Sequence, residues 1–439
     1  MKNQEKKSFY PVFISLVAAL GGLLFALDAA IISGVVPFLK DKFLLTGGQI
    51  GLIVSSLVFG CIIGVMVAGA PADRYGRVKP LIASALLFAT GVLGAACSDS
   101  VVVFVVFRIL AGFAVGISSV ISPMYIAEIA PSNRRGFLVS LYQLTIVTGI
   151  LLGFLSNYWL VDIDSVNNWR IMLSVMLIPA LIFLAGLFFV PESPRWLFQK
   201  GEEEKMLRAL RRINGPANTE HELEIIRNTL ASAVSNAGYK TVFSTVNRKP
   251  LFIGVGLAML QQVTGINAIM YYAPTIFEKT GLNVDSAIYQ TILVGLINLI
   301  FTVIAMFFVD RVGRKPLLVT GSLLMAVSML LVAASFYFQL NSVITLVAIL
   351  LFIAAFASSL GVVMWVVISE IFPSSIRTKA MSISIVSLWI ACFFVALVFP
   401  FLIDKVGVAN TFIIFTFFCI INVFFNIFFI KETKDISLS

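Results

Sequence analysis

Twelve long apolar segments constrain the fold of this 439-residue chain more than any other feature. An α-helix needs roughly 17–25 apolar residues to cross the hydrocarbon core of a bilayer, and each segment is about that long. Hydrophobic residues make up 59% of the chain and charged residues 12%, so lipid must surround most of its surface. The segments lie near residues 11–36, 47–72, 80–97, 101–126, 137–160, 170–190, 250–273, 287–309, 316–338, 343–368, 380–403 and 409–430. The sequence therefore predicts an all-α membrane protein with twelve transmembrane helices.

Two short motifs occur twice in the chain, about 240 residues apart. DRYGR at 73–77 returns as DRVGR at 310–314, and EIAP at 128–131 returns as EIFP at 370–373. Repeats at matching places in two groups of six apolar segments indicate a duplicated membrane domain with a pathway between the copies. We expect a six-helix half at 1–190, a cytoplasmic linker with short amphipathic helices at 191–249, and a second six-helix half with a short tail at 250–439.

The distribution of positive charge predicts the orientation. Of the 31 lysines and arginines, 25 lie in the tails and in the loops that follow even-numbered segments. The positive-inside rule makes that side cytoplasmic, so both termini are predicted to be cytoplasmic. The net charge of +9 is then a topology signal, and no nucleic-acid partner is expected. Four cysteines within apolar segments and a single histidine offer no ligand spacing, so we expect no metal and no cofactor.

The repeated loops suggest a cytoplasmic gate. Their arginines are within reach of carboxylates at neighbouring helix ends, and such pairs would be made when the cytoplasmic side is closed and broken when it opens. Simple positive-inside anchoring is the alternative. The candidate gate residues are Asp73, Arg74, Gly76, Arg77, Glu128, Arg135, Glu192, Arg195, Asp310, Arg311, Gly313, Arg314, Glu370 and Arg377.

Three motifs carry a family resemblance. PESPRWL at 191–197, the loop at 73–77 and QQVTGIN at 261–267 are similar to the sugar porter family of the major facilitator superfamily. The resemblance runs from about residue 21 to residue 433. It implies the major facilitator fold and transport of a monosaccharide by alternating access.

Five amides lie within apolar segments, where they are costly unless they find partners or face a wet cavity. They are Gln143, Gln261, Gln262, Asn267 and Asn298. Each amide both donates and accepts hydrogen bonds, as a ring of sugar hydroxyls requires, and the resemblance implies that all five bind sugar. Contacts between helices are the alternative for any one of them. Unwinding near Gly265 would bring Gln262 and Asn267 together.

Aromatic side chains supply apolar faces for the C–H face of a sugar ring. By resemblance, Phe25 and Trp365 line the site and Tyr271 belongs to an extracellular gate, and we add Trp389 as a further candidate.

Asp28 and Arg108 are charges deep within the first and fourth segments. Unpaired charges there are expensive, so we expect the two to pair. A switch is the functional interpretation, in which Asp28 takes a proton when it is separated from Arg108. By resemblance, an aspartate at this position is typical of proton-coupled members. A static buried ion pair is the alternative.

Two departures from the family pattern affect the substrate. No proline precedes Trp365, which predicts a weaker helix break in the tenth segment. Leu388 and Cys392 stand where relatives carry amides, which predicts the loss of a hydrogen-bond partner for the sugar.

The sequence thus predicts a monosaccharide–proton symporter that acts as a monomer in a cell membrane, with a bacterial inner membrane expected. No catalytic motif indicates an enzyme. An uncoupled sugar facilitator and a non-transporting sugar sensor remain as alternatives, and the sugar itself is left open.

Overall fold

The computed structural model describes residues 10–131, 134–162, 167–215, 219–231, 239–373 and 376–432, without the side chains of residues 135, 228–231, 239–240, 310 and 378. Within this part of the chain, twelve helical spans are long and apolar enough to cross a membrane, as predicted.

The first six spans precede a polar linker and the last six follow it. Span 6 is formed by two consecutive helices, and a short helix extends span 2. The helices of the first group are α1 (Tyr10–Phe43), α2 (Gly47–Val67), α3 (Gly69–Tyr75), α4 (Val78–Ala96), α5 (Val101–Ile129), α6 (Arg135–Leu160), α7 (Asn168–Ser174) and α8 (Leu177–Leu187). Those of the second group are α13 (Arg248–Val263), α14 (Ile266–Glu278), α15 (Val284–Val312), α16 (Arg314–Tyr337), α17 (Ser342–Ala357), α18 (Leu360–Ile371), α19 (Arg377–Val406) and α20 (Val408–Phe428).

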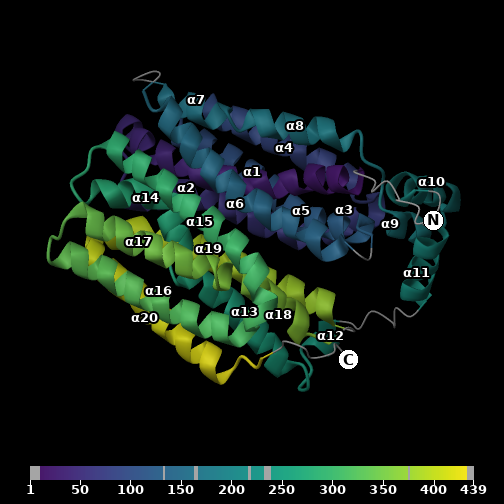
Figure 1. Ribbon diagram of the computed structural model, residues 1–439. Helices are drawn as coiled ribbons and strands as arrows, with labels where there is room; N and C mark the ends of the chain where they lie inside the picture. The colour runs from purple at the N-terminus through teal and green to yellow at the C-terminus, as the bar shows by residue number, and fades with distance from the viewer. Residues whose placement is uncertain are drawn as a thin grey trace, which may run out of the picture.

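The linker contains four short helices at one end of the bundle, on the right in Figure 1. They are α9 (Pro194–Gln199), α10 (Glu203–Asn214), α11 (Thr219–Ala231) and α12 (Tyr239–Val242). The amphipathic α10 buries Met206 and Leu210 on one side and carries charges on the other, as expected. Arg212 of α10 lies over the ring of Tyr10, which ties the linker to the start of α1. We call this the linker end of the bundle and the opposite end the far end.

Two spans of the second half are interrupted. Span 7 breaks at Gly265, whose φ of +96° is left-handed and suits glycine. Span 10 breaks at Ser359, six residues before Trp365, in a segment without proline. The Ser359 hydroxyl donates to the carbonyl of Ala355 at 2.6 Å and competes with the backbone for that acceptor.

The two halves meet along three helix pairs, α2 with α19, α6 with α15, and α1 with α14. Near the far end, a side chain on Gly51 of α2 would place its Cβ 2.1 Å from the carbonyl oxygen of Leu397 in α19. Tyr158 of α6 and Tyr289 of α15 lie 5.6 Å apart between ring centroids, also near the far end. These contacts bring the halves together away from the linker.

Candidate functional site

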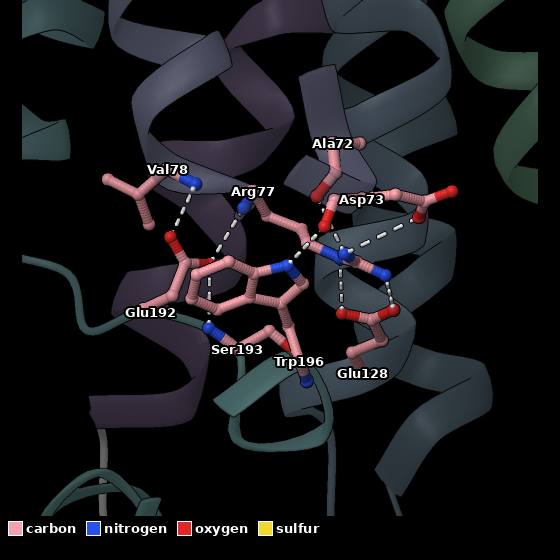
Figure 2. Close-up of polar contacts among 8 residues, drawn as sticks. All are labelled: Ala72, Asp73, Arg77, Val78, Glu128, Glu192, Ser193 and Trp196. Atoms are coloured by element: carbon pink, nitrogen blue, oxygen red, sulfur yellow. Dashed lines mark hydrogen bonds and ion pairs between the residues drawn. The ribbon is translucent and has the colours of Figure 1, made fainter. Parts of the chain in front are cut away.

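A carboxylate seals each of the repeated loops at the linker end. In the first half, Glu192 follows span 6 and accepts hydrogen bonds from the backbone N–H groups of Arg77 (2.7 Å), Val78 (3.2 Å) and Ser193 (2.9 Å), as Figure 2 shows. The loop reaches this position through Gly76, with φ of +93°, where a Cβ would lie 2.3 Å from a Glu192 oxygen. Glycine is therefore required there both for its backbone conformation and for the space that the carboxylate fills.

The Arg77 guanidinium extends from this loop to the end of α5. Its Nε and Nη2 donate to the two oxygens of Glu128 at 2.9 and 2.7 Å, and Nη1 donates to the Ala72 carbonyl at 2.9 Å (Figure 2). Bidentate pairing fixes the orientation of both side chains. Arg77 is 6% exposed, so this pair is shielded from water in a way that ordinary surface pairs are not.

Burial raises the pKa of Glu192 above the usual glutamate value. The three backbone N–H groups and the charge of Arg77 act in the opposite direction and limit the rise.

The second half repeats this arrangement with a residue that the sequence interpretation did not select. Glu432, after α20, accepts from the backbone N–H groups of Arg314 (3.0 Å) and Lys315 (3.1 Å). Arg314 pairs with Glu370 at 3.0 Å, and Gly313 has φ of +101°. The signal was present in the sequence, because Glu432 follows Glu192 by the same interval of about 240 residues that separates the loops.

Neither ion pair links the two halves, because the partners of each pair belong to the same half. Arg77 and Glu128 belong to the first half, and Arg314 and Glu370 to the second, so each pair braces its own half. Both pairs are made in this structure, whose halves meet near the far end.

The other candidate gate residues have smaller roles in the geometry. The Asp73 carbonyl accepts from Trp196 Nε1 at 3.0 Å, and Arg74 stacks on Tyr75. Arg377 Nε donates to the Phe372 carbonyl at 3.1 Å. Arg195 lines a small pocket between α5, α10 and α11, and Arg311 lies in the last turn of α15. The side chains of Arg135 and Asp310 lie outside the described residues.

Three of the predicted amides form a chain at the break in span 7. Gln261 Nε2 donates to the Leu360 carbonyl at 2.9 Å, Gln262 Nε2 to Gln261 Oε1 at 3.1 Å, and Asn267 Nδ2 to Gln262 Oε1 at 2.5 Å. The left-handed Gly265 brings Gln262 and Asn267 together, as predicted. Asn267 Nδ2 also lies 3.1 Å from Cys392 Sγ, so this cysteine, expected only as a missing partner, belongs to the cluster.

Aromatic side chains lie next to this cluster and connect the halves. Phe25 of α1 packs edge-to-face on Trp389 of α19, with ring centroids 4.9 Å apart. Tyr271 is buried beside Cys392. The remaining predicted residues are placed on separate helices, with Gln143 part-buried on α6, Asn298 buried on α15 and Trp365 38% exposed on α18.

Asp28 and Arg108 form an ion pair between α1 and α5, as predicted. Arg108 Nη1 donates to Asp28 Oδ1, and the two residues are 0% and 2% exposed. Asp28 Oδ2 and Arg108 Nε have no hydrogen-bond partner among the described residues. A buried pair that leaves polar atoms unsatisfied on both partners is poorly explained as a purely stabilising contact.

The comparisons with known proteins identify the family. The family model described as sugar (and other) transporter matches residues 14–439. The chain belongs to this family. It is a multi-pass membrane transporter rather than an enzyme, and its place is the cell membrane.

Individual relatives cover nearly the whole chain. An arabinose-proton symporter of Bacillus subtilis (strain 168) is 40% identical over an alignment 439 positions long that covers 98% of this chain and 94% of the relative. A D-xylose-proton symporter of Escherichia coli (strain K12) is 40% identical over an alignment 434 positions long that covers 92% of this chain and 88% of the relative. The solved partially occluded inward open conformation of the xylose transporter XylE from E. coli superposes with a TM-score of 0.87 at 36% identity, covering 98% of this chain and 100% of that one. The major facilitator fold predicted from the sequence is confirmed.

Proposed function

We propose that this protein imports a monosaccharide together with a proton by alternating access. The observation that carries the proposal is the Asp28–Arg108 pair, a buried acid beside the interface between the halves in a chain of the sugar transporter family. Intramembrane charges of this kind mark ion or proton pathways in transporters. The names of the two curated relatives, an arabinose-proton and a D-xylose-proton symporter, support both the sugar and the proton.

The second half supplies most of the sugar contacts in this proposal. Gln261, Gln262 and Asn267 form a connected set of donors and acceptors at the broken part of span 7. Phe25 and Trp389 offer ring faces beside them, while Gln143, Asn298 and Trp365 complete the site from other helices as the halves move. A pentose is the first substrate to test, because the two curated relatives described above are named for pentoses.

The first half supplies the coupling. In its charged state Asp28 pairs with Arg108, and protonation removes the attraction between α1 and α5. The neutral carboxyl no longer holds Arg108, so α1 and α5 are free to shift relative to one another in the conformational change.

The conformation fits the inward-facing part of the cycle. The halves are in contact near the far end through Gly51 and Leu397, and the superposed relative is itself inward open. With the predicted topology, the far end is extracellular, and we assign the linker end to the cytoplasm.

The test is uptake of labelled L-arabinose, D-xylose, D-glucose and D-galactose into proteoliposomes with and without an inward proton gradient. A proton-motive force near 150 mV supplies about 3.5 kcal/mol per proton, enough for accumulation of roughly a few hundred-fold. Accumulation that collapses with an uncoupler supports symport. Equilibration that ignores the gradient would establish a facilitator, and binding without flux a sensor.

The variant Asp28→Asn locates the coupling. We expect it to exchange sugar in counterflow but to accumulate none, while Asp285→Asn, which removes an exposed acid at the start of α15, behaves as the native chain. Accumulation by Asp28→Asn would rule out Asp28 as the proton carrier.

A further inference from the structure

The seam between α1 and α5 gathers three buried polar atoms without a hydrogen-bond partner among the described residues. They are Asp28 Oδ2, Arg108 Nε and Ser122 Oγ. A buried hydroxyl without a partner is costly, and water is the partner that such polar sites take. Two of these atoms belong to the ion pair, whereas Ser122 lies 14 residues closer to the linker end of α5 than Arg108.

A glycine of α1 makes room for the hydroxyls of α5. A Cβ on Gly21 would lie 2.7 Å from Ser122 Oγ and 3.4 Å from Ser118 Oγ, so both hydroxyls face α1 at this level. Gly21 precedes Asp28 by seven residues, which places it on the same face of α1 and about 10 Å toward the linker end. The two serines are 3% and 0% exposed, so they are separated from bulk water.

The polar groups continue to the linker end. The Tyr125 hydroxyl, one turn beyond Ser122 on α5, donates to the carbonyl of Pro191. Pro191 directly precedes Glu192, whose carboxylate holds the loop described above. Tyr125 also lies within electrostatic range of Glu192, Glu128, Tyr10 and Arg212. Asp28, Ser118, Ser122 and Tyr125 therefore succeed one another along one seam of the first half.

We propose that this seam is the route by which the proton leaves Asp28 for the linker side, passing through water held by Ser118 and Ser122 and on to Tyr125. The inference rests on the proposed proton coupling and adds the path to it. Asp28 needs such a path because it is 0% exposed in this structure. Water between the halves therefore does not reach its carboxyl, and the proton must leave through the first half.

The proton balance along this route is simple. Neutral Asp28 gives its proton to a water molecule, and each following hydroxyl or water accepts one proton and passes on another until one is released at the linker end. Asp28 is left as a carboxylate that pairs with Arg108. The other titratable groups within electrostatic range of Asp28 are Cys61 of α2 and Tyr271 of α14, and neither lies between Asp28 and the linker end on this seam.

The test compares two side chains of equal shape at residue 122. Ser122→Val removes the hydroxyl, whereas Ser122→Thr keeps it, and both add the same bulk and β-branching. Each variant is reconstituted in proteoliposomes containing a pH dye, and sugar-driven proton entry is recorded beside sugar counterflow, which needs no net proton movement. Ser119→Ala serves as a control. The hydroxyls of Ser118 and Ser119 both donate to carbonyls of α5, but Ser119 lies about 100° around the helix from Ser118, which faces Gly21.

We expect Ser122→Val to slow proton entry about tenfold or more, which corresponds to about 1.4 kcal/mol in the barrier. Counterflow should stay at the native rate, and Ser122→Thr and Ser119→Ala should keep both rates. Equal proton entry in the Val and Thr variants, or equal loss of proton entry and counterflow in Ser122→Val, would overturn the route.

Ser118→Ala, which removes a hydroxyl without adding bulk, gives a second reading if both branched variants fold poorly. Native rates of proton entry in this variant would also count against the route. If sugar drives no proton entry in the native chain, the proposed symport itself fails, and the route fails with it.

Discussion

The two halves of this transporter have matching loops at the linker end but differ in the middle of the membrane. Glu192 and Glu432 hold matching loops through the same backbone N–H groups, and Arg77 and Arg314 pair with matching glutamates. In the middle of the membrane, the first half carries the Asp28–Arg108 pair and the second carries the amide chain from Gln261 to Asn267. After duplication, the loops at the linker end have stayed alike, while the polar residues in the middle of the membrane have diverged.

This division separates the two ligands of the proposed reaction. A proton-carrying acid needs a low-dielectric setting with few partners, so that a single neighbouring charge controls its protonation. Sugar recognition needs several neutral donors and acceptors in a wet cavity. Placing them on different halves allows each to keep its own environment, and relative motion of the halves couples the two.

The largest expected effect comes from breaking the ion pair of the first half. Arg108→Met leaves the Asp28 carboxylate buried without its partner, and we expect a loss of about 3–5 kcal/mol of stability at neutral pH. The double variant Asp28→Asn/Arg108→Met should regain most of this loss. Thermal unfolding in detergent measures both, and equal stability of the single and double variants would contradict the pairing.

An amide of the second half should affect the sugar alone. In Gln262→Leu we expect KM for the sugar to rise about tenfold, equivalent to about 1.4 kcal/mol, because hydrogen bonds to its hydroxyls are lost. Accumulation at saturating sugar should equal that of the native chain. Gln199→Leu, on an exposed part of α9, is the matched control. A lower accumulation ratio in Gln262→Leu would show that sugar and proton sites are not divided between the halves.

The shared loops should respond equally in both halves. Glu192→Gln and Glu432→Gln each replace one carboxylate oxygen that accepts a backbone N–H group with an amide NH2 that cannot accept, and we expect each to lower stability by about 1–3 kcal/mol. Glu204→Gln, in an exposed ion pair of α10, should have little effect. A large loss in one half and none in the other would show that the repeats are no longer mechanically equivalent.

The smallest effect is the pH dependence of Glu192. Burial raises its pKa, so the folded chain binds this proton at a higher pH than the unfolded chain does. The contribution of Glu192 to stability is therefore greatest at acidic pH and falls as pH rises through the raised pKa. The difference in Tm between the native chain and Glu192→Gln should shift in favour of the native chain on acidification, and an opposite shift would contradict the raised pKa.

The sequence predicted the twelve spans, the ion pair and the break at Gly265 because each leaves a local signal. Apolar length identifies a span, an intramembrane charge demands a partner, and glycine beside two amides marks a left-handed break. Arg77 and Glu128 were also selected, because both belong to motifs that occur twice.

Other features depend on contacts that no local pattern contains. The break at Ser359 comes from hydroxyls that take carbonyl acceptors, and serine within an apolar segment does not by itself predict this. Glu432 was not selected from the sequence, although its distance from Glu192 repeats the duplication. The role of Cys392 depended on which residue Asn267 would face across α14 and α19. Whether the ion pairs brace one half or link both was a question of three-dimensional placement.

The two loop carboxylates have a consequence for biosynthesis. Glu192 lies 115 residues beyond Arg77 in the chain, and Glu432 lies 118 residues beyond Arg314. A ribosome therefore completes all six spans of a half before the acid that closes the early loop emerges. Each half is sealed by the last residues made for it, so a truncated or misinserted half would keep an open loop that quality-control proteases could recognise.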